Sequence, residues 1–154
     1  MDFLKKIAPD LIAVVAFLVI SFCYFAGPVS EGLVLGGHDN TAGVGLNNEI
    51  NAYREATGES SRWTNALFGG MPTYQIAPSY ESSRVLGSFN RIYGLGTTGV
   101  VFYVFAYLLG FYILMRAFNF KVWLSALGAV VWAFSSYFFI IIAAGHIWKV
   151  LTLA

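Results

Sequence analysis

The sequence is poor in charged residues. Only 11% of its 154 residues are Asp, Glu, Lys or Arg, whereas a soluble domain usually has about 25%. A chain with so few charges cannot present a water-facing surface on every side, so lipid must be the solvent for much of it. The formal net charge is only +1, which excludes nucleic acid as a partner and excludes a polybasic patch for the membrane surface.

Cysteine is equally scarce. Cys23 is the only cysteine and lies inside an apolar run, so the chain has no internal disulfide. Lipoprotein processing requires a small residue just before the modified cysteine, and the bulky Phe22 argues against it. No cofactor-binding motif is evident and no metal-ligand set is expected. The sequence leaves open whether a divalent metal is needed.

Long apolar runs are abundant, and three are long enough to cross a bilayer, which takes roughly 17–25 helical residues. The expected spans are about 10–28, 98–116 and 122–145. Backbone polar groups must be satisfied internally in lipid, so we expect helices. The predicted fold class is an all-α polytopic membrane protein. Residues 1–154 form a single membrane domain of three transmembrane helices. A long outer loop, residues 29–97, separates the first two spans and contains short amphipathic helices.

The basic residues near the span ends predict an orientation. Lys5 and Lys6 precede the first span, and Arg116 and Lys121 flank the tight turn between the second and third. Positive charges at span ends favour the cytoplasmic side. The N-terminus is therefore expected in the cytoplasm and the loop 29–97 outside it. The alternative for the first run is a cleaved signal peptide, but no small-x-small cleavage site is well formed after it.

The loop carries six of the eight acidic residues. Residues 39–41, Asp-Asn-Thr, are expected to cap a helix, and Gly58 is expected to end it. Glu49 lies either on a solvated face of this helix or acts as a second acid. The apolar residues that recur at helical spacing are Leu46, Ile50 and Tyr53.

An aromatic stretch, "RWTNALFGGMPTYQ", follows this helix. Its two glycines precede Met-Pro and predict a turn. Aromatic faces beside amide side chains suit a sugar ring, which has apolar C–H faces and polar edges. The alternative is an interfacial belt, where Trp and Tyr collect regardless of function. The candidate substrate contacts of this stretch are Trp63, Asn65, Tyr74 and Gln75.

Three stretches, "HDNTAG", "RWTNALFGGMPTYQ" and "AAGHIWK", resemble the YfhO-like bacterial membrane proteins, which belong to the integral-membrane glycosyltransferases of the C-type fold. The resemblance runs through most of the chain and matches the N-terminal portion of that much longer, many-spanned family. It implies transfer of a sugar from a polyprenyl-phosphate carrier to a glycan, lipid or protein acceptor of the cell envelope. It also implies a multi-pass protein of the bacterial inner membrane, and an inactive fragment if residues 1–154 stand alone.

The same resemblance implies a general base. The class places an acidic residue in the first outer loop, just after the first span, and Asp39 matches that position. Two adjacent acids are common in the class, whereas this sequence has His38-Asp39, and His38 becomes a candidate for orienting the acceptor. A positioned carboxylate typically contributes about 10²–10⁴-fold to the rate. The alternative for Asp39 is a helix cap without a catalytic role.

The leaving lipid phosphate requires a cation. His146 and Lys149, at the outer end of the third span, and Arg62 in the loop are the candidates. The alternatives are an interface-marking role for Lys149 and a surface ion pair for Arg62.

Two other functions remain open on the sequence. One is a transporter or lipid-glycan flippase, which usually needs charged or broken helices at mid-membrane. The other is a non-catalytic membrane component that binds glycan or partner proteins through the loop and tolerates loss of Asp39.

Overall fold

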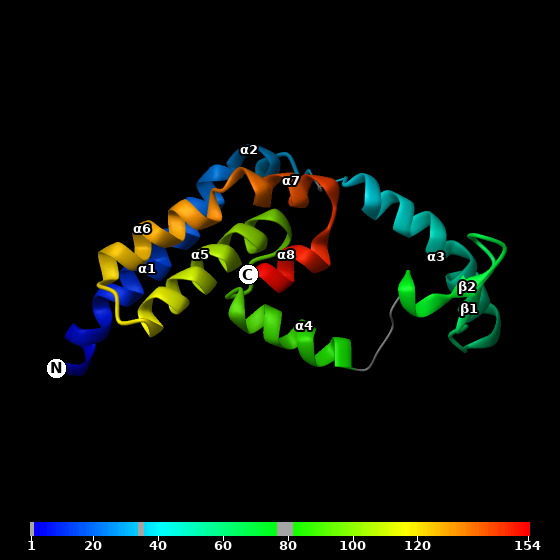
Figure 1. Cartoon of the computed structure of the whole chain (residues 1–154), viewed down its shortest axis with the longest axis horizontal. Coiled ribbons are helices and arrows are strands. Elements are labelled where there is room, and N and C mark those ends of the chain that lie inside the picture. Colours follow the sequence, from blue (N-terminus) through cyan, green and yellow to red (C-terminus); the bar gives the residue numbers. More distant parts are fainter. Residues whose placement is uncertain (1, 34–35, 77–81) are drawn as a thin grey trace.

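The computed structural model describes residues 2–33, 36–76 and 82–154, which form helices and one small hairpin (Figure 1). The hairpin consists of β1 (Trp63–Thr64) and β2 (Met71–Pro72), and a 3-10 turn, η1 (Thr73–Gln75), follows it. The helices are α1 (Asp2–Tyr24), α2 (Ala26–Ser30), α3 (His38–Thr57), α4 (Ser82–Tyr93), α5 (Gly99–Ala117), α6 (Val122–Ala133), α7 (Ser136–Ala144) and α8 (Ile147–Leu153).

Two helices are long and apolar enough to cross a membrane. They are the Leu4–Tyr24 part of α1 and the whole of α5. The second expected span, 98–116, matches α5 within one residue at each end. The first expected span, 10–28, is shifted, because α1 begins near the N-terminus and ends at Tyr24. Gly27 and Pro28 belong instead to the separate short helix α2.

The third expected span, 122–145, is not one continuous helix. α6 and α7 are bent by 47° at a break between them, so they cross a membrane only as a bent pair. Ser135 has an extended backbone, with φ −61° and ψ 134°. The N–H groups of Phe134 and Ser135 bond back to the carbonyls of Val130 and Trp132 and close the end of α6. Because the break contains neither proline nor glycine, the apolar pattern alone does not reveal it.

The core lies where α1, α5 and α6 run side by side (Figure 1). α6 presents small residues to α5 at every fourth position, and all three are fully buried. Small residues let helix backbones approach closely in a membrane protein, as their place in the third apolar run predicts. Tyr107 of α5 stacks on Phe138 of α7 with ring centroids 4.2 Å apart. These buried small residues are Ser125, Ala129 and Ala133.

The segment after α7 folds back toward the bundle. Gly145 adopts a left-handed conformation, with φ 89°, and ends α7. α8 then returns alongside α5, as Figure 1 shows, and buries Val150 completely. An added Cβ on Gly110 of α5 would overlap the carbonyl oxygen of Ala154. The residues after the third apolar run thus form a short helix packed against α5.

The loop between the first spans extends away from the bundle as α3 and the hairpin (Figure 1). Gly58, with φ 76°, ends α3 as predicted. The expected cap at residues 39–41 is wrong, because Gly37 occupies the N-cap position and makes no side-chain cap bond. Asp39 instead lies in the first turn, where its negative charge favours the positive end of the helix dipole. Gly69 and Gly70 turn the hairpin at positive φ, also as predicted.

Candidate functional site

The site is built where the segment before α3 meets the end of α7. Gly37, just before α3, is buried against Gly145 at the end of α7. A Cβ added to Gly37 would lie 2.6 Å from the Cα of Gly145 and 2.8 Å from its nitrogen. Only a residue without a side chain fits there. The two glycines therefore bring the first turn of α3 next to the turn between α7 and α8.

This approach pairs Asp39 with His146. The Oδ2 atom of Asp39 lies 3.1 Å from Nδ1 of His146, which directly follows Gly145. About half of each side chain is exposed, 52% for Asp39 and 47% for His146. The contact is an ion pair when the imidazole is protonated. One carboxylate oxygen is thus oriented by the histidine.

An open pocket of about 670 Å³ lies beside this pair, between α3 and α8. Its polar lining combines Asp39 with the amide of Asn47, the imidazole of His146 and the ammonium group of Lys149. Apolar side chains form much of the rest, as in small-molecule sites that use a few convergent polar groups for specificity. The apolar lining residues are Val44, Ile76, Ile147 and Trp148.

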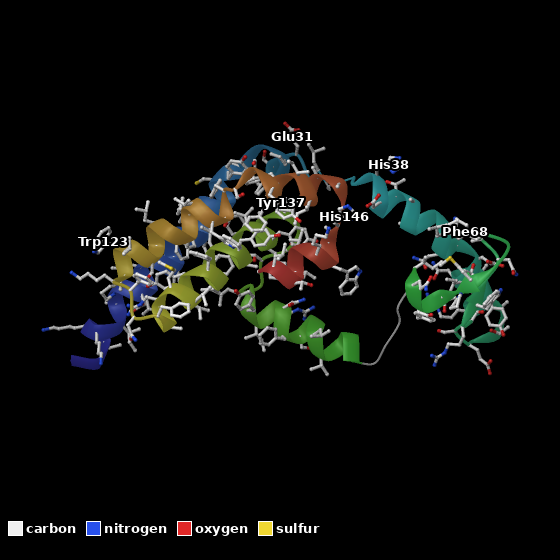
Figure 2. All side chains as sticks on the ribbon, in the orientation of Figure 1. Glu31, His38, Phe68, Trp123, Tyr137 and His146 are labelled. Atoms are coloured by element: carbon white, nitrogen blue, oxygen red, sulfur yellow. The ribbon has the colours of Figure 1, made fainter. Side chains whose placement is uncertain are left out.

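Only some of the predicted site residues line the pocket. Asp39, His146 and Lys149 line it together, although more than 100 residues separate the first from the others. His38 does not line it, and Figure 2 shows its side chain on the side of α3 that faces away from His146. The remaining candidates belong to the hairpin region, which lies toward the far end of α3 (Figure 1). They are Arg62, Trp63, Asn65, Tyr74 and Gln75.

The hairpin is held by Glu49, on the second half of α3. Its carboxylate accepts hydrogen bonds from the Thr64 hydroxyl, from the Asn65 backbone N–H at 2.8 Å and from the Asn65 side-chain amide at 3.4 Å. These bonds, that of Thr64 first, hold the pKa of Glu49 below its ordinary value of 4.5. Glu49 thus lies on an exposed face of α3, as one of the two expectations had it, and also bonds to the hairpin. Since Glu49 lies ten residues from Asp39, roughly 15 Å along α3, it is not a second acid of the same pocket.

The aromatic residues of the hairpin lie apart from one another. Trp63 covers Gly70, whose added Cβ would lie 2.6 Å from the Trp63 Nε1 atom. That Nε1–H also donates to Asn65 Oδ1 at 3.3 Å. Phe68 is 90% exposed at the hairpin tip, far from His146 in Figure 2. Tyr74 is exposed on the turn that follows.

Among the pocket residues that the sequence analysis did not identify are Asn47 and Trp148, and a sequence pattern identifies the first of them. Asp39, Gly43 and Asn47 recur at every fourth position, so they share one face of a helix. A search for polar residues on the Asp39 face identifies Asn47. Trp148 lies between two candidates, His146 and Lys149, but nothing in its own spacing marks it as a pocket residue. Within the described ranges, no three His, Cys, Asp or Glu side chains come together as a metal site.

No protein-family profile matches this chain, and no curated protein or solved structure is significantly similar to it.

Proposed function

We propose that the protein is a membrane glycosyltransferase that takes a sugar from a polyprenyl-phosphate carrier, with Asp39 as the general base. The observation that carries the proposal is the pairing of Asp39 with His146 at 3.1 Å in a pocket that also contains Lys149. Support comes also from the resemblance of the motifs around these residues to YfhO-like proteins. In this proposal the pocket faces the extracytoplasmic side of a bacterial inner membrane.

For this transfer the pocket must deprotonate the acceptor, orient the carboxylate that does so and bind the leaving phosphate. Asp39 takes the proton of the acceptor hydroxyl as its oxygen attacks the anomeric carbon of the sugar. The bond from that carbon to the phosphate oxygen breaks, and the carrier phosphate leaves with the electron pair. His146 orients the carboxylate, with its Nδ1 atom 3.1 Å from Oδ2 of Asp39. Lys149, on the same pocket wall, meets the leaving phosphate as a charge-assisted donor.

The test is transfer by the full-length protein in proteoliposomes, with a panel of polyprenyl-phosphate-linked sugars and envelope acceptors. Asp39→Asn should lower the transfer rate by about 10²–10⁴-fold without changing the amount of inserted protein. Glu31→Gln, an exposed carboxylate that follows α2, is the matched control and should transfer normally. Normal transfer by Asp39→Asn would rule out Asp39 as the general base, and no transfer by the wild-type protein would favour a non-catalytic glycan- or partner-binding component.

One observation favours a second candidate, a transporter or lipid-glycan flippase. The 47° break between α6 and α7 is the kind of interrupted helix that lines transport sites. The two functions separate in proteoliposomes without acceptor. A flippase moves a fluorescent carrier-linked sugar between leaflets, and its rate does not depend on the Asp39 carboxylate as a base.

A further inference from the structure

α4 has an apolar face that the protein does not cover. Val85, Leu86, Phe89 and Ile92 are each more than half exposed, from 56% for Leu86 to 76% for Ile92. At 100° per residue they fall on one side of the helix, with spacings of one, three, four and seven residues. Gly87 and Arg91 fall on the opposite side. α4 is therefore a strongly amphipathic helix whose apolar side has no partner in the described ranges.

The position of α4 indicates what covers that face. Its last residue, Tyr93, donates a hydrogen bond from its hydroxyl to the carbonyl of Ala106, at 3.1 Å. Ala106 lies seven residues inside α5, which corresponds to roughly 10 Å from Gly99 along the helix axis. A short connection, residues 94–98, then leads to the start of α5. The C-terminal end of α4 is thus fixed beside α5, about two turns inside a helix that is long and apolar enough to cross a membrane.

The charges of α4 fit a lipid surface. Its sequence, "SSRVLGSFNRIY", contains two arginines and no acidic residue. At the junction with α5, Arg91 lines a pocket of about 300 Å³ with Asn90, Thr97 and Thr98. Helices with an apolar face and a basic polar face lie in the membrane interface, with the apolar side buried roughly 5–10 Å below the headgroups.

We propose that α4 is an interfacial helix that inserts its Val85–Leu86–Phe89–Ile92 face into the bilayer leaflet at the Gly99 end of α5, with Arg91 at the level of the anionic headgroups. The occupant of the face is lipid rather than a second copy of the chain or another protein. This inference rests on the membrane insertion of α5 and is independent of the proposed glycosyltransferase activity.

The experiment uses the full-length protein with Cys23→Ser, reconstituted in vesicles of zwitterionic and anionic phospholipid. A single cysteine at Phe89→Cys or at Gly87→Cys carries an environment-sensitive fluorophore. Gly87 is the matched control, because an added Cβ there meets nothing within 4 Å and the position lies on the polar side of the same helix. The quenchers are lipids with a doxyl group near the headgroup, and aqueous iodide.

The label at Phe89 should be quenched several-fold more by the doxyl lipid than the label at Gly87, and iodide should show the reverse order. Equal iodide quenching at both positions would overturn the proposal, because the apolar face would then be in water. Protection of the Phe89 label from both quenchers would also overturn it, since protein would then cover the face. If Phe89→Cys does not insert, Val85→Cys on the same face provides the same readout.

Discussion

Gly37 and Gly145 approach so closely that a single added methyl group on Gly37 would lie 2.6 Å from the Cα of Gly145. This backbone contact joins the outer loop to the third apolar run, and the next residues on each side include Asp39 and His146. The pocket therefore depends on two positions that carry no functional group. Each glycine is needed for a different reason, Gly37 for space and Gly145 for its positive φ of 89°.

Gly37→Ala should separate α3 from the bundle. The new Cβ meets backbone rather than a flexible side chain, so one segment must move, and overpacking of this kind typically costs about 1–3 kcal/mol. We expect a lower melting temperature in detergent and faster proteolysis after α3. Gly36→Ala is the control, because its added Cβ meets nothing within 4 Å. Equal stability of the two variants would contradict the close contact.

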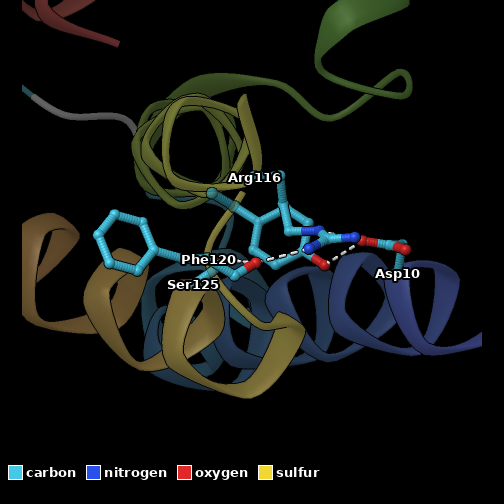
Figure 3. A network of polar contacts seen from close by, with 5 residues as sticks. Asp10, Arg116, Phe120 and Ser125 are labelled. Carbon is cyan, nitrogen blue, oxygen red and sulfur yellow. Dashed lines mark hydrogen bonds and ion pairs between the residues drawn. The ribbon is translucent and has the colours of Figure 1, made fainter. Parts of the chain in front are cut away.

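A second prediction concerns the ion pair that joins α1 to α5 (Figure 3). The Oδ1 atom of Asp10 accepts hydrogen bonds from Arg116 Nε at 2.8 Å and from the Tyr112 hydroxyl at 2.5 Å. Arg116 also donates to the carbonyl of Phe120 at 2.6 Å and thereby holds the turn before α6. Asp10→Asn should lower the free energy of unfolding by about 1.5–3 kcal/mol, the range for hydrogen bonds to charged groups.

The double variant Asp10→Asn/Arg116→Gln tests whether this loss comes from the pair. If the two residues are coupled, its destabilisation in a detergent-based unfolding titration is smaller than the sum of the single losses. Lys121→Gln, a charge loss in the same turn region, should have little effect. Strict additivity of the single variants would show that the pair contributes nothing.

The hairpin should loosen as pH falls, because Glu49 holds it. The pKa of Glu49 is below its ordinary value of 4.5 through its bonds to Thr64 and Asn65. A group whose pKa is lowered in the folded state contributes stability that is complete above its unfolded pKa and is lost as pH falls through the folded one. Hydrogen exchange of the Asn65 amide should therefore show protection at neutral pH that decreases below about pH 4.5.

Glu49→Gln should remove that pH dependence and lower the protection at neutral pH, since the charged acceptor is gone. Glu55→Gln on the same helix, an exposed carboxylate, should keep both. A pH-independent wild-type protection factor would show that the Glu49 bonds do not hold the hairpin.

The sequence reveals the helices that are long and uniform, and the turns that need particular residues. α5 matches the predicted second span because its 19 residues contain no charged residue before Arg116, in the last turn, and no proline. Gly58 and the Gly69–Gly70 turn were predictable because positive φ favours glycine. The bend at Ser135 was not predictable, because the same apolar residues can form either one continuous helix or two helices with a bend between them.

The candidate site was only partly predictable, for a related reason. The sequence indicates three of the pocket residues, because charged and titratable residues are scarce and these lie near the ends of apolar runs. They are Asp39, His146 and Lys149. Their meeting depends on the Gly37–Gly145 contact, which no periodicity encodes. The hairpin residues have side chains just as suitable for a sugar. The hairpin, however, lies beside the second half of α3, at Glu49, whereas the α3 residues that line the pocket belong to its first half, and distance along a helix is not visible in a motif.

The last prediction concerns the side of the membrane on which the pocket opens. Lys5 and Lys6 lie at one end of α1, and the turn between α5 and α6 lies at that same end of the bundle (Figure 1). α3 extends from the opposite end, so a single label on each side decides the orientation. With Cys23→Ser, Glu59→Cys should react with an impermeant maleimide in intact spheroplasts, whereas Phe118→Cys, 69% exposed in the turn, should react only after lysis. The positive-inside rule requires this order. The reverse order would place Asp39 in the cytoplasm, where an extracytoplasmic acceptor cannot reach it. The proposed transfer reaction would then be wrong, whereas the packing of α1, α5 and α6 would be unaffected.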